Sequence, residues 1–271
     1  AKLVANGGLV AMAGALAEYF GAIEGASLEA NKGAYSYAWM IIFAVIAAIM
    51  VLIGLYHIRM LPSNQIPSTT KKTTSEVGRE LVAVIANFFT KKHIFYYICF
   101  IILYRLAEGF IMKIAPLFLR ASREVGGLGL SLKEIGTLNG VFGSAAFVLG
   151  SLLAGIYVSK FGLKRTLFTL CCIFNLPFLA YTFLAVTQPT NVYLIGTCIT
   201  MEYFGYGFGF VGLTLFMMQQ IAPGKHQMSH YAFASGIMNL GVMLPGMVSG
   251  YFSDLLGYRN FFIYVLIATI P

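Results

Sequence analysis

Long apolar runs alternate with short polar segments along most of this 271-residue chain. A helix that spans a bilayer needs about 20 mostly apolar residues. Seven runs reach that length, and an eighth begins at Phe261. The runs lack the period-two alternation and regular turn spacing of a membrane β-barrel. We therefore predict an all-α polytopic membrane protein with spans at Leu3–Ile23, Tyr35–Tyr56, Ile94–Leu119, Ile135–Ser159, Thr166–Val186, Val192–Ile221 and Ser229–Ser253.

The longest polar interruption covers residues 59–93. Its second part repeats apolar side chains every three or four residues, at Val77, Leu81, Ile85 and Phe88, which is the spacing of one helix face. We predict a cytosolic linker that holds a short amphipathic helix on the membrane surface. An ordinary loop is the alternative.

Composition agrees with a lipid environment. Only 10% of the residues are charged and 59% are apolar, whereas a soluble domain carries about 25% charged residues. The net charge of +8 does not indicate nucleic acid as a partner, because the basic residues form short clusters between apolar runs rather than a stripe. The partner that this composition predicts is the lipid bilayer.

The distribution of Lys and Arg predicts the orientation. Assigning the linker to the cytosol gives that side more than twice the cations of the other side, as the positive-inside rule requires. Arg105 and Lys113 fall inside a span and are not counted. The cytosolic set is Lys2, Arg59, Lys71, Lys72, Arg79, Lys91, Lys92, Lys160, Lys164, Arg165 and Lys225, and the outer set is Lys32, Arg120, Arg123, Lys133 and Arg259.

Cysteines and glycines inside the spans have structural interpretations. Gly205, Gly207 and Gly209 lack the strand and lysine of a phosphate loop, so we predict close helix approach or bending. The cysteines show no disulfide or metal-ligand spacing. We predict buried thiols and no metal site for Cys99, Cys171, Cys172 and Cys198.

Two spans end in related segments. In each, one glycine precedes a second by seven residues, and a cation follows two residues later. We predict that the first glycine allows close helix packing, that the second ends the helix in a left-handed turn, and that the cation faces the negative helix end. This gating device comprises Gly155, Gly162, Lys164 and Arg165 in one segment and Gly250, Asp254, Gly257 and Arg259 in the other.

These segments resemble the Gly-x-x-x-Asp-x-x-Gly-x-Lys/Arg loop signature of the major facilitator superfamily, with Ser159 at the Asp position of the first. Residues 104–110, 116–119, 201–209 and 227–232 carry a second, narrower resemblance. Through them the chain resembles the AmpG-type muropeptide permeases of that superfamily. Acetyl-coenzyme A transporters share the general layout. Tyr203 stands where the resemblance implies a smaller polar amide.

The resemblance implies a domain organisation. Residues 1–58 would be the last two helices of an N-terminal bundle, residues 59–93 the linker, and residues 94–271 the C-terminal bundle with an incomplete last helix. The chain begins inside one apolar run and stops soon after the start of another, so we expect a fragment truncated at both ends. The implied function is proton-coupled import of muropeptides across the bacterial inner membrane. The resemblance also implies that the full-length transporter is a monomer with no cofactor and takes its energy from the proton gradient.

Ionisable groups inside spans are functional candidates, because burying them in a membrane is costly. Arg105 and Glu108 are three apart on one helix face. Glu108 and Glu202 are each eleven residues from the outer end of their span, roughly 16 Å deep, where secondary transporters place their sites. We hypothesise that Glu108 or Glu202 couples proton entry and that Arg105 binds a substrate anion. A static Arg105–Glu108 pair is the alternative.

Further span residues are candidates for substrate binding. Lys113 either binds a substrate anion or extends outward to the interface. Asn139 and Asn175 either bond between helices or line a cavity. Tyr104, Tyr203 and Tyr206 are candidates for stacking on the sugar rings of a muropeptide.

Two other functions stay open at this point. One is transport of another amphipathic anion, including acetyl-coenzyme A or a drug. The other is an intramembrane transferase, which would need a catalytic polar cluster at a membrane face. The loops of this sequence contain no such cluster, so we predict a transporter and not an enzyme.

Overall fold

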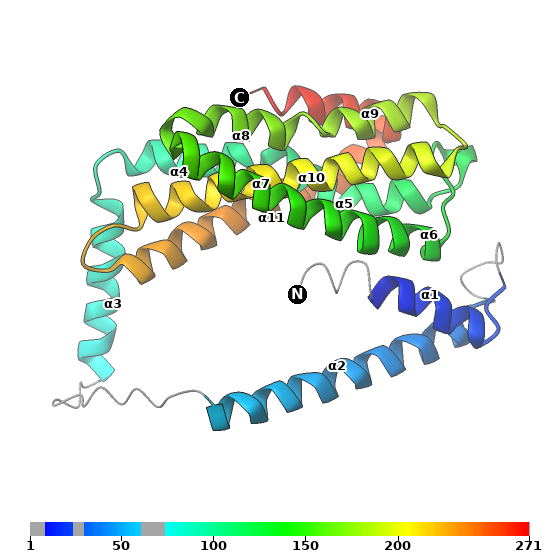
Figure 1. The fold of residues 1–271 in the computed structure, drawn as a ribbon, viewed down its shortest axis with the longest axis horizontal. Helices are drawn as coiled ribbons and strands as arrows, with labels where there is room; N and C mark the ends of the chain where they lie inside the picture. Colours follow the sequence, from blue (N-terminus) through cyan, green and yellow to red (C-terminus); the bar gives the residue numbers. More distant parts are fainter. Residues whose placement is uncertain (1–8, 24–29, 61–73, 271) are drawn as a thin grey trace.

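The computed structural model describes residues 9–23, 30–60 and 74–270, and every regular element within these ranges is a helix (Figure 1). Most of the helices lie side by side in one bundle, with α3 across one end and α2 set apart. The elements are α1 (Val10–Tyr19), α2 (Lys32–Met60), α3 (Thr74–Phe89), α4 (Ile94–Tyr104), α5 (Leu106–Arg120), α6 (Leu132–Thr137), α7 (Ser144–Phe161), α8 (Leu163–Asn175), α9 (Phe178–Thr187), α10 (Val192–Phe216) and α11 (Gln227–Ile267).

Five described helical stretches are long and apolar enough to cross a membrane. The prediction of an all-α membrane bundle is confirmed. The stretch that contains Glu202 is not among the five, although its predicted bounds match α10 together with the π-helical turn Met217–Ile221. Its Glu and glycine-rich run lower the hydropathy, and α7, α8 and α9 pack around it. The five stretches are Lys32–Met60, Ile94–Arg120, Leu132–Phe161, Leu163–Thr187 and Gln227–Ile267.

Several predicted span boundaries were wrong. The first predicted span is described as a helix only over Val10–Tyr19, and residues 1–8 lie outside the described part. The third is interrupted at Arg105, and the fifth near Pro177. The chain reverses at Gly257, so the last helix begins there and not at Phe261. Hydropathy reports the length of an apolar run but not the local backbone geometry, which explains these errors.

The second glycine of each helix-end segment has a backbone conformation that residues with a side chain rarely adopt. Gly162 has φ 77° and ψ 148°, and Gly257 has φ 70° and ψ 161°. This region is almost exclusive to glycine, so the positive φ is confirmed but the predicted left-handed αL turn is wrong. Gly155 and Gly250 also differ from the prediction. A Cβ added at either would meet nothing within 4 Å, so neither allows a close helix approach among the described residues.

Close packing occurs instead along α10, as its glycine series predicted. A Cβ at Gly207 would lie 2.2 Å from the carbonyl oxygen of Phe147 on α7. Gly150 of α7 approaches Phe204 of α10 in the same way, with a Cβ at 2.3 Å from the carbonyl oxygen. Ser151 donates a hydrogen bond to the carbonyl oxygen of Gly207 at 3.2 Å. The α7–α10 contact is therefore held by backbone surfaces rather than by long side chains.

Substituting Gly207 with Ala is expected to lower the free energy of unfolding by about 1–3 kcal/mol, because the methyl group overpacks the α7–α10 contact. The measurement is the unfolding midpoint of the complete protein in detergent. Gly155→Ala is the matched control, since its methyl group enters open space and should cost nothing. Equal effects of the two substitutions would contradict this packing.

The linker helix α3 packs on α11 at one end of the bundle, which we call the linker end. Phe88 is fully buried and its ring centroid lies 5.7 Å from that of His230. Lys91 donates hydrogen bonds to the carbonyl oxygens of Ile221 and, at 2.8 Å, Pro223. Desolvation by burial lowers the pKa of Lys91. The amphipathic helix is thus confirmed, and its membrane-surface position stays a prediction.

The buried face of α3 differs from the predicted stripe. Val84 is 7% exposed and packs inward with Phe88, whereas Leu81 is 58% exposed. Ile85 is half-buried, and the side chain of Val77 lies outside the described part. The buried face of α3 is rotated about the helix axis relative to the predicted stripe, because α11 covers only part of the apolar side of α3.

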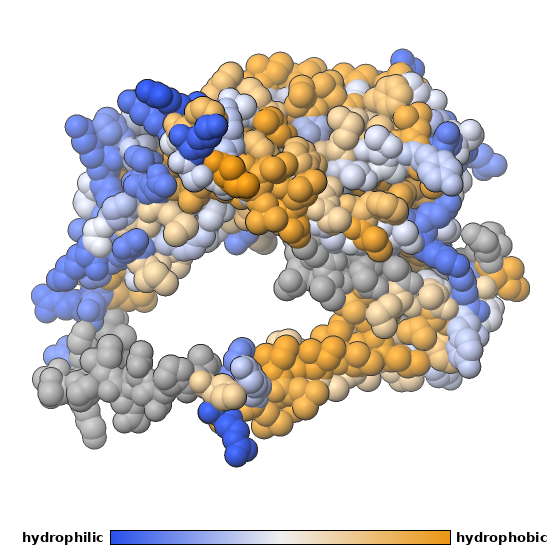
Figure 2. Space-filling view, viewed as in Figure 1, coloured by the Kyte–Doolittle hydropathy of each residue, from blue (hydrophilic) through white to orange (hydrophobic). Residues whose placement is uncertain are grey.

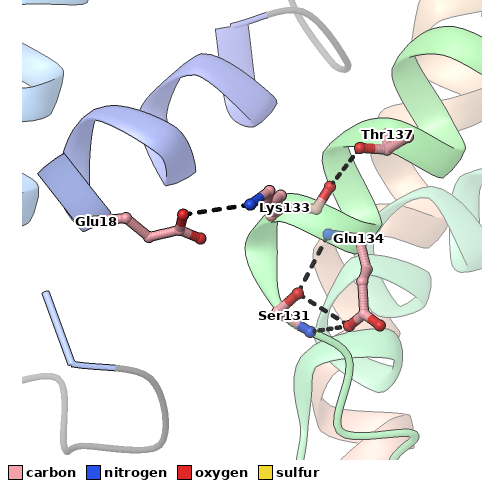
Figure 3. Close-up of polar contacts among 5 residues, drawn as sticks. All are labelled: Glu18, Ser131, Lys133, Glu134 and Thr137. Atoms are coloured by element: carbon pink, nitrogen blue, oxygen red, sulfur yellow. Dashed lines mark hydrogen bonds and ion pairs between the residues drawn. The ribbon is translucent and has the colours of Figure 1, made fainter.

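The opposite end of the bundle, which we call the far end, carries the predicted outer loops. Glu18 of α1 forms an ion pair with Lys133 of α6 at 3.4 Å (Figure 3). Ser131 caps α6, accepting from the Glu134 amide at 3.2 Å while its own amide donates to the Glu134 carboxylate at 2.8 Å. Arg123 donates to the carbonyl oxygens of Gln188 and Pro189, each at 2.9 Å. Lys133 and Arg123, two residues of the predicted outer set, therefore lie at the same end of the bundle.

Apolar side chains cover α2 and the middle of the bundle, and hydrophilic ones gather towards the two ends (Figure 2). This is the surface of a protein whose middle is immersed in lipid. Two of the cysteine predictions were wrong for this reason, because Cys99 and Cys172 are exposed on the apolar surface rather than buried. Cys198 is buried and Cys171 is half-buried.

Candidate functional site

A cavity of about 1150 Å³ opens among α2, α5, α6, α7, α9 and α10. It brings together six of the candidate residues singled out from the sequence, of which Tyr206 of α10 is one. Glu108 and Lys113 come from α5, Glu202 and Tyr203 from α10, and Asn139 from the π-helical turn Leu138–Gly143. Two carboxylates from different helices thus line one cavity.

Arg105 and Glu108 form a buried bidentate ion pair, in which Glu108 lines the cavity and Arg105 lies behind it. The Nε of Arg105 donates to Oε2 of Glu108 at 2.6 Å, and Nη2 donates to Oε1 at 2.5 Å. The two side chains are only 5% and 6% exposed. The guanidinium carbon also lies 5.5 Å from the ring centroid of Phe210. Such a pair satisfies both charges with hydrogen bonds, which a low-dielectric site requires.

The pair sits at the break between α4 and α5. Arg105 has φ −109° and ψ 4°, which is outside the helical region, and places Glu108 in the first turn of α5. Glu108 therefore lies near the positive end of that helix dipole. The preceding residue, Tyr104, donates its hydroxyl to the carbonyl oxygen of Gly209 at 2.7 Å and so ties the break to α10.

Tyrosines connect the two carboxylates. Tyr206 lines the cavity and interacts electrostatically with both Glu108 and Glu202. Glu202 has further electrostatic contacts with Tyr181 and Tyr203. Glu108 thus pairs with a cation, and Glu202 interacts electrostatically with three tyrosines.

Three candidate residues do not line the cavity. Arg105 reaches it only through Glu108, and Tyr104 is 3% exposed with its hydroxyl bonded to α10. The amide of Asn175 donates to the carbonyl oxygen of Cys171 at 3.0 Å within α8. The Oδ1 atom of Asn139, by contrast, is buried without a hydrogen-bond partner among the described residues.

Sequence reasoning missed other residues that line the cavity. Arg120 and Lys32 lie at helix ends and line the cavity. Their sequence positions predicted only that they belong to the outer set of cations. Trp39 and Tyr35 of α2 and Tyr181 of α9 also contribute. A seven-residue spacing between Lys113 and Arg120, which places both on one face of α5, was the available signal.

Comparisons with known proteins agree with this architecture. The profile of the Major Facilitator Superfamily matches residues 5–221. The chain belongs to the major facilitator superfamily. The anhydromuropeptide permease of Escherichia coli (strain K12) is 23% identical over 205 residues, which cover 76% of this chain and 40% of that protein. The putative transporter AmpG 1 of Rickettsia bellii (strain RML369-C) is 25% identical over 234 residues, covering 85% and 55%.

The chain spans about half the length of the curated relatives it matches. The predicted superfamily is confirmed by the matched profile, and a multi-pass membrane protein follows from the apolar helices. The names of these relatives describe transporters and not enzymes. The roles of the individual site residues stay predictions.

Proposed function

We propose that this chain is part of a proton-coupled secondary transporter that imports muropeptides across the bacterial inner membrane. The observation that carries the proposal is the presence of Glu108 and Glu202 in one cavity among membrane-spanning helices. Intramembrane carboxylates that face a cavity are the usual means of proton relay. The names of the Escherichia coli and Rickettsia bellii relatives support the substrate class.

The two carboxylates have different roles in this proposal. Both oxygens of Glu108 accept charge-assisted hydrogen bonds from Arg105, so a proton there would have to displace two strong bonds. Glu202 is half-buried and lines the cavity, where a proton can reach it. We therefore assign proton carriage to Glu202, and assign to the Arg105–Glu108 pair the task of holding the α4–α5 break in place.

Substrate and proton are coupled through Tyr206 in this scheme, because it contacts both acids. A substrate group that enters between Glu108 and Glu202 changes the hydration of both, and hence the ease of proton binding at Glu202. Tyr203 and Tyr206 offer flat ring faces to the sugar rings of the substrate.

The test is uptake of labelled anhydromuropeptide by the complete protein in proteoliposomes, with and without an inward proton gradient. We expect accumulation above equilibrium only with the gradient. A protonophore should abolish it, and the label should then equilibrate without accumulating. Equal accumulation with and without the gradient would reject proton coupling, and no uptake in either condition would reject the substrate.

A further inference from the structure

Three cations line the cavity towards the far end of the bundle. Lys32 comes from the start of α2, and Lys113 and Arg120 come from α5. Leu117 lies between the latter two, at spacings of four and three residues, and lines the same cavity. The three α5 residues therefore form one helix face, along which Lys113 and Arg120 are about 10 Å apart.

These cations have no ion pair among the described residues, where the ion pairs are Arg105–Glu108 and Lys133–Glu18. Glu108 lies five residues deeper than Lys113, about 7.5 Å along the axis, and is already bound to Arg105. Glu202 is the other carboxylate of the cavity. Among the described residues, Lys32, Lys113, Arg120 and Arg105 are four cations against the two carboxylates of Glu108 and Glu202, an excess of two positive charges.

The aliphatic stem of Lys113 packs against Gly246 of α11. A Cβ added at Gly246 of α11 would lie 3.4 Å from Cγ and 3.6 Å from Cε of Lys113, so the lysine stem crosses this glycine. Gly246 has no side chain of its own to displace it. The lysine stem is thus held against α11, while Lys113 lines the cavity without an ion pair among the described residues. An uncompensated charge inside a span indicates a ligand.

We infer that Lys113 and Arg120, with Lys32 facing them, form an anion-binding subsite at the mouth of the cavity. It receives the carboxylate groups of the substrate before the rest of the molecule reaches Glu108 and Glu202. The ligand is an amphipathic molecule with two carboxylates, one for each α5 cation, and these two residues lie about 10 Å apart along the helix axis. The choice of a muropeptide as test substrate rests on the proposed function; the subsite itself does not.

The chemistry of the mouth fits such a ligand. Arg120 presents a planar fork to one carboxylate, and Lys113 presents a point charge to the other. Trp39 and Tyr35 of α2 line the same cavity and supply flat apolar faces for the body of the ligand. A positive mouth also raises the local concentration of anions and repels cations.

The first test measures the charge of the mouth without any substrate. Cysteine is placed at Leu117, which is 58% exposed, in the complete protein with its native cysteines replaced by Ser or Ala. Modification rates are compared for an anionic sulfonatoethyl and a cationic trimethylammonioethyl methanethiosulfonate. Lys113→Gln and Arg120→Gln should each lower the ratio of anionic to cationic rates about tenfold. Lys160→Gln is the matched control, an exposed cation of α7 outside the cavity. An unchanged ratio overturns the inference.

The second test measures recognition. We expect Arg120→Gln to raise the KM for anhydromuropeptide with free carboxylates about tenfold while kcat changes little, and to leave the KM for the amidated molecule unchanged. Equal KM changes for both molecules, or none, overturn the subsite. If the complete protein transports neither molecule but the modification ratio still falls, the proposed substrate is wrong and the anion-binding mouth stands.

Discussion

Replacing Arg105 with Gln is expected to lower the free energy of unfolding by about 3–5 kcal/mol, because it leaves the carboxylate of Glu108 buried without its cation. The Glu108 side chain is 6% exposed, so water cannot replace the two lost hydrogen bonds. At roughly 2–4 °C per kcal/mol, the unfolding midpoint should fall by at least about 6 °C. The measurement is thermal unfolding of the complete protein in detergent, with tryptophan fluorescence as readout.

The double substitution Arg105→Gln with Glu108→Gln separates a lost charge pair from lost packing. It removes both charges and leaves no carboxylate buried without a cation, so most of the lost stability should return. Lys133→Gln is the control at an exposed pair, since the Lys133 and Glu18 side chains are 63% and 52% exposed and should contribute almost nothing. An effect of Arg105→Gln as small as that of Lys133→Gln would show that the pair does not stabilise the α4–α5 break.

The presence of the two glutamates in one cavity could be predicted from the sequence because helical rise is constant. Counting eleven residues inward from the span ends predicted that Glu108 and Glu202 lie at one level, and both line the same cavity. The pairing of Arg105 with Glu108 could also be predicted from the sequence, since residues three apart share a helix face. What the count does not contain is rotation about each helix axis. It therefore could not tell that Asn139 faces the cavity and Asn175 does not.

Rotation also explains the partial error in α3. The pattern of apolar residues defined an arc, but the position of α11 decides that Val84 and Phe88 occupy its buried part and Leu81 does not. The cysteine error has a related cause. Lipid tails and a protein core are both apolar, so hydropathy does not separate Cys172, which is exposed, from Cys198, which is buried.

The break at Arg105 and the reversal at Gly257 depend on contacts between distant segments. Tyr104 bonds to Gly209, and Phe252 stacks on Tyr264 at 5.4 Å across the reversal. Neither contact is visible in local sequence. The glycine segments were informative about φ but not about packing, because the partner surface decides whether a Cβ finds open space, as at Gly155, or a backbone carbonyl, as at Gly207.

Replacing Glu202 with Gln is expected to reduce accumulation of labelled anhydromuropeptide to the equilibrium level while exchange of label between the two sides continues. Gln has the shape and hydrogen-bonding capacity of a protonated carboxyl group but cannot release a proton. The transporter would therefore still alternate between its two states, without linking that cycle to the proton gradient. A substitution that only damaged the fold would abolish both accumulation and exchange, so the pair of assays separates the two causes.

Glu18→Gln provides the matched control for this prediction, because it makes the same chemical change at an exposed far-end position outside the cavity. It should leave both accumulation and exchange unchanged. Glu108→Gln distinguishes the two acids. It removes the partner of the buried Arg105, so it should lower stability as well as uptake, whereas Glu202→Gln should leave the unfolding midpoint close to that of the wild type. Full accumulation by Glu202→Gln would move proton carriage away from Glu202, and loss of exchange in that variant would assign it a structural role instead.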